Sequence, residues 1–119
     1  MLAIALGLAV LVSYLPALEG EFLNWDDNTL VSENPNVHTL SSHTVGWAFT
    51  NSHLGNWTPL AWLSHALDWD LYGSHPRGHH ATNLALHVAS TLLLFLVFRQ
   101  MTGALWRSAA VAALFGLHP

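Results

Sequence analysis

Two adjacent carboxylates, Asp26 and Asp27, are the side chains of this 119-residue chain that are best suited to acid–base chemistry. They lie in the run FLNWDDN, residues 22–28, which shows no helical periodicity. Neighbouring side chains in an extended or turn segment point in different directions, so one carboxylate can face a cleft while the other is anchored. The alternative interpretation is structural, because Asp-Asp-Asn also favours an Asx turn at the exit of a preceding helix.

A second group of polar side chains lies where a long apolar run begins. It consists of imidazoles, one guanidinium and one amide: His75, Arg77, His79, His80, Asn83 and His87. On a helix, positions 80, 83 and 87 lie on nearly the same face, so a polar stripe would extend about two turns into the apolar run. Such groups are costly when they face lipid, and they therefore indicate a protein interior or a wet cavity, and by default a functional site.

Three interpretations of this second group stay open. The imidazoles and the guanidinium at a helix N-terminus could bind an anion such as a lipid phosphate. His79, His80 or His87 could instead form a metal site with an Asp, although their spacing matches no known zinc motif. The structural alternative is hydrogen bonding that joins this helix to its neighbours.

Membrane helices are the elements expected to position these residues. The chain is 52% hydrophobic and 8% charged, whereas about 25% of residues are charged in a typical soluble domain. Residues 1–18 and 81–98 are apolar runs without Lys or Arg, each long enough to cross most of a bilayer core. Between them, residues 19–80 form a polar loop rich in Trp and His. We therefore expect an all-α fold of multi-pass membrane helices with a long outer loop.

The few positive charges predict the orientation. Arg99 and Arg107 flank the short segment 99–107, whereas the seven acidic residues and Arg77 lie in or beside the long loop. The positive-inside rule then places the short segment in the cytoplasm and the long loop outside. A third apolar run, residues 108–119, is too short to span, and we expect it to be the start of a truncated third membrane helix.

Composition argues against several other classes of protein. Without cysteine the chain can form neither a disulfide framework nor a thiolate metal site. The formal net charge of −4 argues against a nucleic-acid partner. No internal repeat or flexible linker interrupts the sequence, so we expect one unit without an internal domain boundary.

Local signals predict two short helices inside the loop. Ser41 or Ser42 can cap a helix that ends at Asn51. Thr58 can cap a second helix that has Pro59 in its first turn. The segment between the first membrane helix and these two helices shows little periodicity and is expected to be irregular.

The second loop helix is predicted to be amphipathic and to end at Gly73. Its leucines recur three or four residues apart, at Leu60, Leu63, Leu67 and Leu71. Because this stripe is too short to span, we expect the helix to lie along the membrane surface, with Trp62 and Trp69 at headgroup level. Trp25, Trp57 and Trp62 could anchor the loop in this way or stack on a sugar ring. A new helix is then expected to begin at Pro76 and to end at Gly103.

Five segments carry a family resemblance. They are FLNWDD (22–27), WAFT (47–50), NWTPLAWLSHALD (56–68), GHHATNLALH (78–87) and AALFGLHP (112–119). In this order they resemble the N-terminal portion of bacterial transmembrane-and-TPR O-mannosyltransferase-like proteins, which are membrane glycosyltransferases of the GT-C class that use polyprenyl-phosphate sugars. The resemblance covers residues 22–119 and is more specific than any single motif.

The resemblance implies that the first outer loop presents the acidic motif, Asp26 and Asp27, beneath a cavity that later helices complete. The wider class often has Asp-Glu at this motif, so the resemblance does not decide which carboxylate is the base. We take Asp26 as the base and Asp27 as a residue that positions it or binds a divalent ion. Many relatives have a third acid where this chain has Asn28, which argues against a catalytic role for that position.

The implied reaction transfers a sugar, expected to be mannose, from a polyprenyl phosphate to a Ser or Thr hydroxyl of an acceptor protein. The hydroxyl needs a carboxylate to accept its proton, and the departing phosphate needs its charge stabilised. Candidates for binding the phosphate are Arg77, His79 and His80, while Asn83 and His87 would contact substrate or have a structural role. No cofactor is expected beyond, at most, a divalent metal.

The resemblance also implies a bacterial inner membrane protein whose long loop is periplasmic. The family's later loops and TPR helices do not occur in this sequence, so we expect the chain alone to be inactive. Two other classes stay open: a component of a transporter or channel, and a non-catalytic membrane scaffold.

Overall fold

The computed structural model describes residues 1–118, which form two compact units. Met1–Glu19 and the chain from His80 onward form one unit, which we call the apolar unit. Gly20–His79 form the other, which we call the polar unit. Every secondary-structure element within residues 1–118 is a helix or a helical turn, so the predicted all-α class is confirmed.

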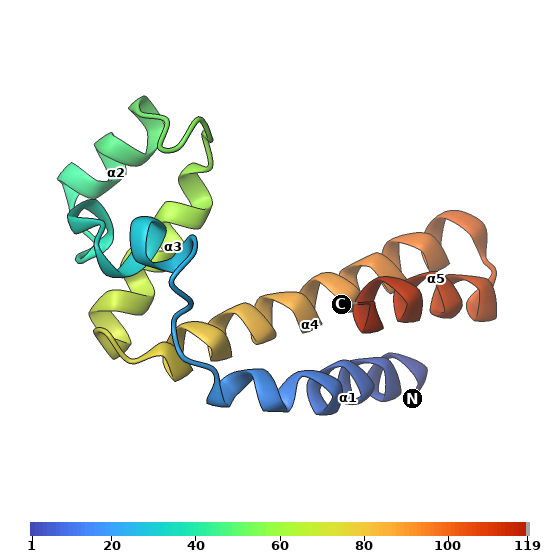
Figure 1. The fold of residues 1–119 in the computed structure, drawn as a ribbon. Coiled ribbons are helices and arrows are strands. Elements are labelled where there is room, and N and C mark those ends of the chain that lie inside the picture. Colours follow the sequence, from blue (N-terminus) through green and yellow to red (C-terminus); the bar gives the residue numbers. More distant parts are fainter. Residues whose placement is uncertain (119) are drawn as a thin grey trace. The chain divides into compact units, whose positions relative to one another are not determined.

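The apolar unit contains the long apolar helices. Helix α1 (Leu2–Tyr14) continues into the 3₁₀ turn η1 (Leu15–Glu19), and α4 (Pro76–Thr102) is followed by α5 (Leu105–Leu117). Both α1 and α5 run antiparallel to α4 (Figure 1). The predicted limits of α4 are confirmed: it begins at Pro76 and ends before Gly103, whose φ of +65° favours glycine.

Two stretches are long and apolar enough to cross a membrane, Leu2–Glu19 and Pro76–Thr102. Most of their apolar side chains face outward rather than into the unit: Ile4 is 67% exposed and Leu93 is 62% exposed. Aliphatic side chains that face outward over most of a helix are typical of a helix surrounded by lipid.

Small residues let the three helices of the apolar unit approach one another closely. A core cluster consists of Leu6, Phe95, Ala109 and Ala112. Near the end of α5, a Cβ placed on Gly116 would lie 2.7 Å from Val10 Cγ2 and 2.8 Å from Thr91 Oγ1. Both of these neighbours are fully buried, so α5 packs against α1 and α4 at a point where only glycine fits.

The polar unit begins with short helical turns. A π-helical turn η2 (Asn28–Ser32) is followed by the 3₁₀ turn η3 (Pro35–Val37), in a segment that we expected to be irregular. The side chain of Asn34 accepts a hydrogen bond from the backbone N–H of Asn36 at 3.1 Å and so caps η3. These local hydrogen bonds give the segment a defined path without apolar periodicity.

The two predicted loop helices are confirmed. Helix α2 (Ser42–Thr50) has Ser41 as its N-cap, with the Ser41 hydroxyl accepting from the Thr44 N–H at 3.2 Å. Helix α3 (Pro59–Tyr72) starts after Thr58, although the Thr58 side chain makes no capping hydrogen bond, and it ends at Gly73 with a φ of +59°.

Helix α3 buries the face that carries Trp62 and Ala66 inside the polar unit. Trp62 and Ala66 pack with Val37 of η3 and Ala48 of α2, and Trp62 is only 3% exposed. The expectation of a headgroup position is therefore wrong for Trp62, because this indole fills the core of the polar unit. Three of the four stripe leucines are exposed instead: Leu60, Leu67 and Leu71.

Replacing Gly116 tests the close packing of the apolar unit. Gly116→Ala should destabilise the chain by roughly 1–3 kcal/mol, because the added methyl group overlaps Val10 and Thr91. Gly7→Ala is the matched control, since a Cβ there meets Leu92 and Val88 at an ordinary 3.7 Å. Thermal unfolding of each purified variant in detergent measures the change in stability. Equal stability of the two variants would contradict this packing.

Candidate functional site

The two predicted catalytic carboxylates have different surroundings. Asp27 is partly buried, and its Oδ2 accepts a hydrogen bond from the backbone N–H of Leu23 at 2.9 Å. Asp26 is exposed, and its backbone carbonyl accepts a hydrogen bond from the Leu30 N–H at 2.8 Å. One carboxylate is thus anchored while its neighbour is exposed, and a general base must be accessible to its substrate. The catalytic roles themselves stay predictions.

The tryptophans near this segment also differ in exposure. Trp25, next to Asp26, is 83% exposed and free to anchor or to stack. Trp57 is 61% exposed, with its indole N–H donating to the Phe49 carbonyl at 3.1 Å. Trp62 is buried in the core and is not available to a sugar ring. Trp25 is therefore the best placed of the three predicted stacking residues.

The polar unit also brings together a buried cluster, His65, Asp68 and His79. His65 and Asp68 lie one turn apart on α3, and His79 comes from the first turn of α4. One nitrogen or oxygen from each side chain lies within 4.8 Å of the other two. Asp68 and His79 are almost completely buried, with His79 Nδ1 at 3.9 Å from Asp68 Oδ2, while His65 is partly buried. Only His79 of these three was among the predicted site residues.

The His79 ring is held in one orientation. Its Nε2 lies 3.0 Å from the Gly73 carbonyl oxygen, which can only accept, so Nε2 carries the hydrogen. Phe22 and Trp69 pack edge-on against the ring, with centroid distances of 5.3 Å and 6.1 Å. These contacts direct Nδ1 towards Asp68.

Gly78 sets the approach of α4 to the end of α3. A Cβ at this position would lie 2.2 Å from Tyr72 Cγ and 2.6 Å from Tyr72 Cβ, close to the backbone end of a side chain that cannot easily move. Glycine therefore allows the first turn of α4 to pack here, and this packing places His79 next to Asp68.

Burial and the charge of Asp27, one of the acidic pair, affect the pKa of His65 in this cluster. Burial lowers the pKa of His65 below its usual 6.5, and this effect outweighs the opposing charges of Asp68 and Asp27. The nearby His79 lowers the pKa of His65 further. Asp27 is thus close enough to affect His65, which the separation of 38 positions in sequence does not suggest.

The predicted phosphate-binding residues differ in burial and in the contacts that they make. Arg77 is exposed, whereas His79 is buried and bonded to Gly73. His80 belongs to the apolar unit, where it lines a cavity. Arg77 and His80 stay candidates for contacting an anion, but the His79 ring is already engaged inside the protein.

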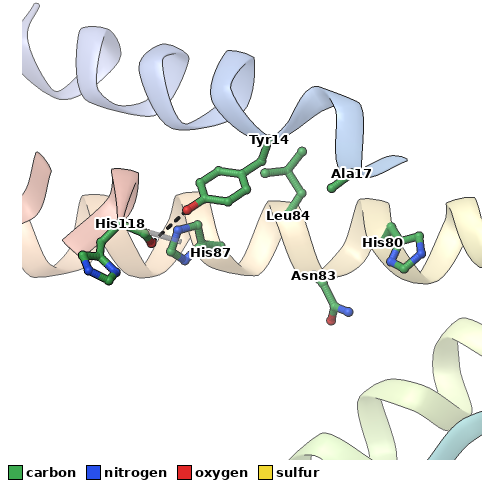
Figure 2. Close-up of a pocket in the computed structure, with 7 residues that line it drawn as sticks. All are labelled: Tyr14, Ala17, His80, Asn83, Leu84, His87 and His118. Carbon is green, nitrogen blue, oxygen red and sulfur yellow. Dashed lines mark hydrogen bonds between the residues drawn. The ribbon is translucent and has the colours of Figure 1, made fainter. Parts of the chain in front are cut away.

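The polar stripe of α4 lies along one side of this cavity, as its spacing predicts. The cavity has a volume of about 320 Å³. Figure 2 shows its lining residues, which come from η1 and α1, from α4 and from the end of α5: Tyr14, Ala17, His80, Asn83, Leu84, His87 and His118. The polar stripe of α4 is therefore partly covered by residues of α1, η1 and the end of α5.

Within this cavity the innermost stripe residue has a structural contact. His87 Nε2 lies 3.0 Å from the Gly116 carbonyl oxygen of α5, and the Tyr14 ring packs edge-on against His87 at 5.3 Å. The Tyr14 hydroxyl donates to the His118 carbonyl at 2.9 Å (Figure 2). For His87 the structure favours the interhelical role, whereas Asn83 is exposed.

Sequence reasoning missed His65 and Asp68. The sequence pattern that could have indicated them is His-x-x-Asp, which places both side chains on one face of α3 near the buried Trp62 and Ala66. His79 follows after the turn at Gly73. The leucine stripe obscured it, because that stripe indicated an amphipathic helix at the membrane surface rather than a helix with a buried polar cluster.

The lowered pKa of His65 predicts a pH effect on stability. His65 is kept neutral when folded but protonates near pH 6.5 when unfolded, so stability should be full above pH 6.5 and should decrease as the pH falls below it. Unfolding at pH 7.5 and 5.5, followed by tryptophan fluorescence in detergent with a chelator present, measures this loss.

His65→Gln should reduce that pH dependence, whereas His43→Gln, at an exposed position of α2, should retain it. An undiminished pH dependence in His65→Gln would show that this imidazole is not the group responsible.

Comparisons with known proteins agree with the resemblance seen in the sequence. The chain is 33% identical over 116 residues to Protein O-mannosyl-transferase Tmtc1 of Drosophila melanogaster. The match covers 91% of this chain but 13% of the relative, so the chain spans only a small part of that protein's length. No family model and no solved structure matches the chain. The similarity supports a relationship to O-mannosyltransferase-like proteins.

Proposed function

We propose that this chain is part of a membrane glycosyltransferase that transfers mannose from a polyprenyl-phosphate donor to a Ser or Thr hydroxyl of an acceptor protein. The observation that carries the proposal is the similarity to a protein O-mannosyl-transferase over 91% of the chain. The exposed Asp26 beside the anchored Asp27 supplies a group that the chemistry needs.

In this proposal Asp26 is the general base. The acceptor hydroxyl is a weak nucleophile, and the Asp26 carboxylate takes its proton as the oxygen attacks the anomeric carbon. The bond between that carbon and the phosphate oxygen breaks, and polyprenyl phosphate leaves with the electron pair. Attack opposite the leaving group inverts the configuration at the anomeric carbon. Asp27 fixes the backbone of this segment through Leu23.

The remaining polar groups would serve the donor. The departing phosphate gains negative charge, which Arg77 and the partly buried His80 can stabilise. The outward aliphatic faces of α1 and α4 are compatible with a bilayer that contains the polyprenyl chain. We propose that the polar unit lies on the extracytoplasmic side and that Arg99 and Arg107 lie on the cytoplasmic side.

Replacing the proposed base tests this function. In a full-length protein carrying this chain, Asp26→Asn should lower the rate of mannose transfer from a polyprenyl-phosphate donor to a Ser/Thr peptide by about 10²–10⁴-fold, because the amide cannot accept the proton. Asp27→Asn should have a smaller effect, since an amide oxygen can still accept from the Leu23 N–H.

Glu33→Gln is the matched control, because Glu33 is an exposed acid in the same segment. Full transfer by Asp26→Asn would remove this residue as the base. If the unaltered protein transfers no sugar, as a scaffold or transporter component would not, the proposed function is overturned.

A further inference from the structure

We propose that His65, Asp68 and His79 bind one divalent transition-metal ion of the zinc type. This site lies within the polar unit, it is separate from the Asp26 carboxylate, and it does not depend on the proposed transferase function. Four observations lead to it: the convergence of three ligand atoms, the fixed tautomer of His79, two buried nitrogens without a hydrogen bond within residues 1–118, and the chemical nature of the ligand set.

The first observation is geometric. Tetrahedral zinc, with ligand distances of about 2.0–2.2 Å, separates two of its ligand atoms by about 3.4 Å. His79 Nδ1 and Asp68 Oδ2 lie 3.9 Å apart, and no pair of ligand atoms among the three residues exceeds 4.8 Å. A movement of about 1.4 Å at the widest pair would give the required ligand separation, which small side-chain rotations supply.

The second observation is the tautomer of His79. Because its Nε2–H donates to the Gly73 carbonyl, the neutral ring presents the lone pair of Nδ1 to the Asp68 carboxylate. Two electron-rich atoms facing each other in a buried site repel unless a cation or a proton lies between them. A histidine whose second nitrogen donates to a backbone carbonyl is also the usual arrangement of a metal ligand.

The third observation is that each of the two imidazoles has a buried nitrogen that makes no hydrogen bond within residues 1–118. Nδ1 of His65 and Nδ1 of His79 are buried and have no hydrogen-bond partner among residues 1–118. Buried polar atoms are nearly always hydrogen-bonded, so two such nitrogens beside one carboxylate call for a shared ligand. A bound metal ion would satisfy both nitrogens at once.

The ligand set then selects the metal. Two imidazole nitrogens and one carboxylate oxygen suit zinc and similar ions, whereas magnesium and calcium prefer oxygen ligands. Three protein ligands leave the fourth position for water, and the partly exposed side of His65 offers a path for exchange. The bound ion would join α3 to the first turn of α4 and would add positive charge near Asp27, whose own charge reaches His65.

Metal binding can be tested without any sugar transfer. The full chain, purified in detergent with a tag that lacks histidine and then stripped with a chelator, is titrated with Zn²⁺ by calorimetry and with Co²⁺ by visible absorption. We expect one ion per chain, an intense tetrahedral Co²⁺ spectrum and a higher thermal midpoint with Zn²⁺.

Variants of the ligands identify the site. His65→Gln and Asp68→Asn should each weaken Zn²⁺ binding at least tenfold and abolish the tetrahedral spectrum, whereas His43→Gln should bind as the unaltered chain does. Gly78→Ala should also weaken binding, because a clash with Tyr72 moves His79. Far-UV circular dichroism of the metal-free variants shows which of them are folded.

Two results would overturn the proposal. One is an unaltered chain that binds neither Zn²⁺ nor Co²⁺, which would mean that a proton alone joins His79 to Asp68. The other is Zn²⁺ binding that persists unchanged in folded His65→Gln and Asp68→Asn. Asp26→Asn should bind Zn²⁺ normally, so failure of the proposed transferase function and failure of this metal site would be seen separately.

Discussion

One constraint governs this chain: a polar segment rich in His, Asp and Trp is joined at both ends to helices whose outward faces are aliphatic. Aliphatic side chains such as Ile4 and Leu93 stay exposed in the apolar unit, and a lipid environment makes such exposure favourable. The polar unit instead builds its own core around Trp62 and needs water for its exposed acids. The proposed chemistry uses this division, because the exposed Asp26 carboxylate belongs to the polar unit.

Inside the polar unit, the end of α3 and the start of α4 determine the position of His79. Gly73 ends one helix and supplies the carbonyl that orients His79, and Gly78 allows the close packing against Tyr72. Burying His79 beside Asp68 is costly unless a cation or a proton compensates the facing electron pairs. The proposed metal ion would offset this energetic cost.

Local rules predicted the helices well. The cap at Ser41 and the ends of α3 and α4 at Gly73 and Gly103 depend on neighbouring residues only, and each is where the sequence placed it. The polar stripe on α4 was also predictable. Because the α-helix repeats every 3.6 residues, His80 and His87 lie about two turns apart on one face and line one cavity. Such features need no knowledge of what a helix packs against.

Long-range features were not predictable in the same way. The leucines and Trp62 of α3 were expected at the membrane surface, but the core around Val37 and Ala48 takes up Trp62. Likewise, the pairing of Asp68 with His79 depends on how two helices meet beyond a turn, and no spacing rule specifies it. The adjacent positions of Asp26 and Asp27 did predict that one carboxylate would be anchored and the other available.

The most direct measurement of the account is the sidedness of the polar unit. Because the chain has no cysteine, a single Glu33→Cys or Met101→Cys substitution gives a unique labelling position in the polar unit or at the exposed end of α4. If the polar unit is extracytoplasmic, a membrane-impermeant maleimide should label Glu33→Cys in intact cells and Met101→Cys only after permeabilisation. Labelling of Glu33→Cys only after permeabilisation would contradict this orientation.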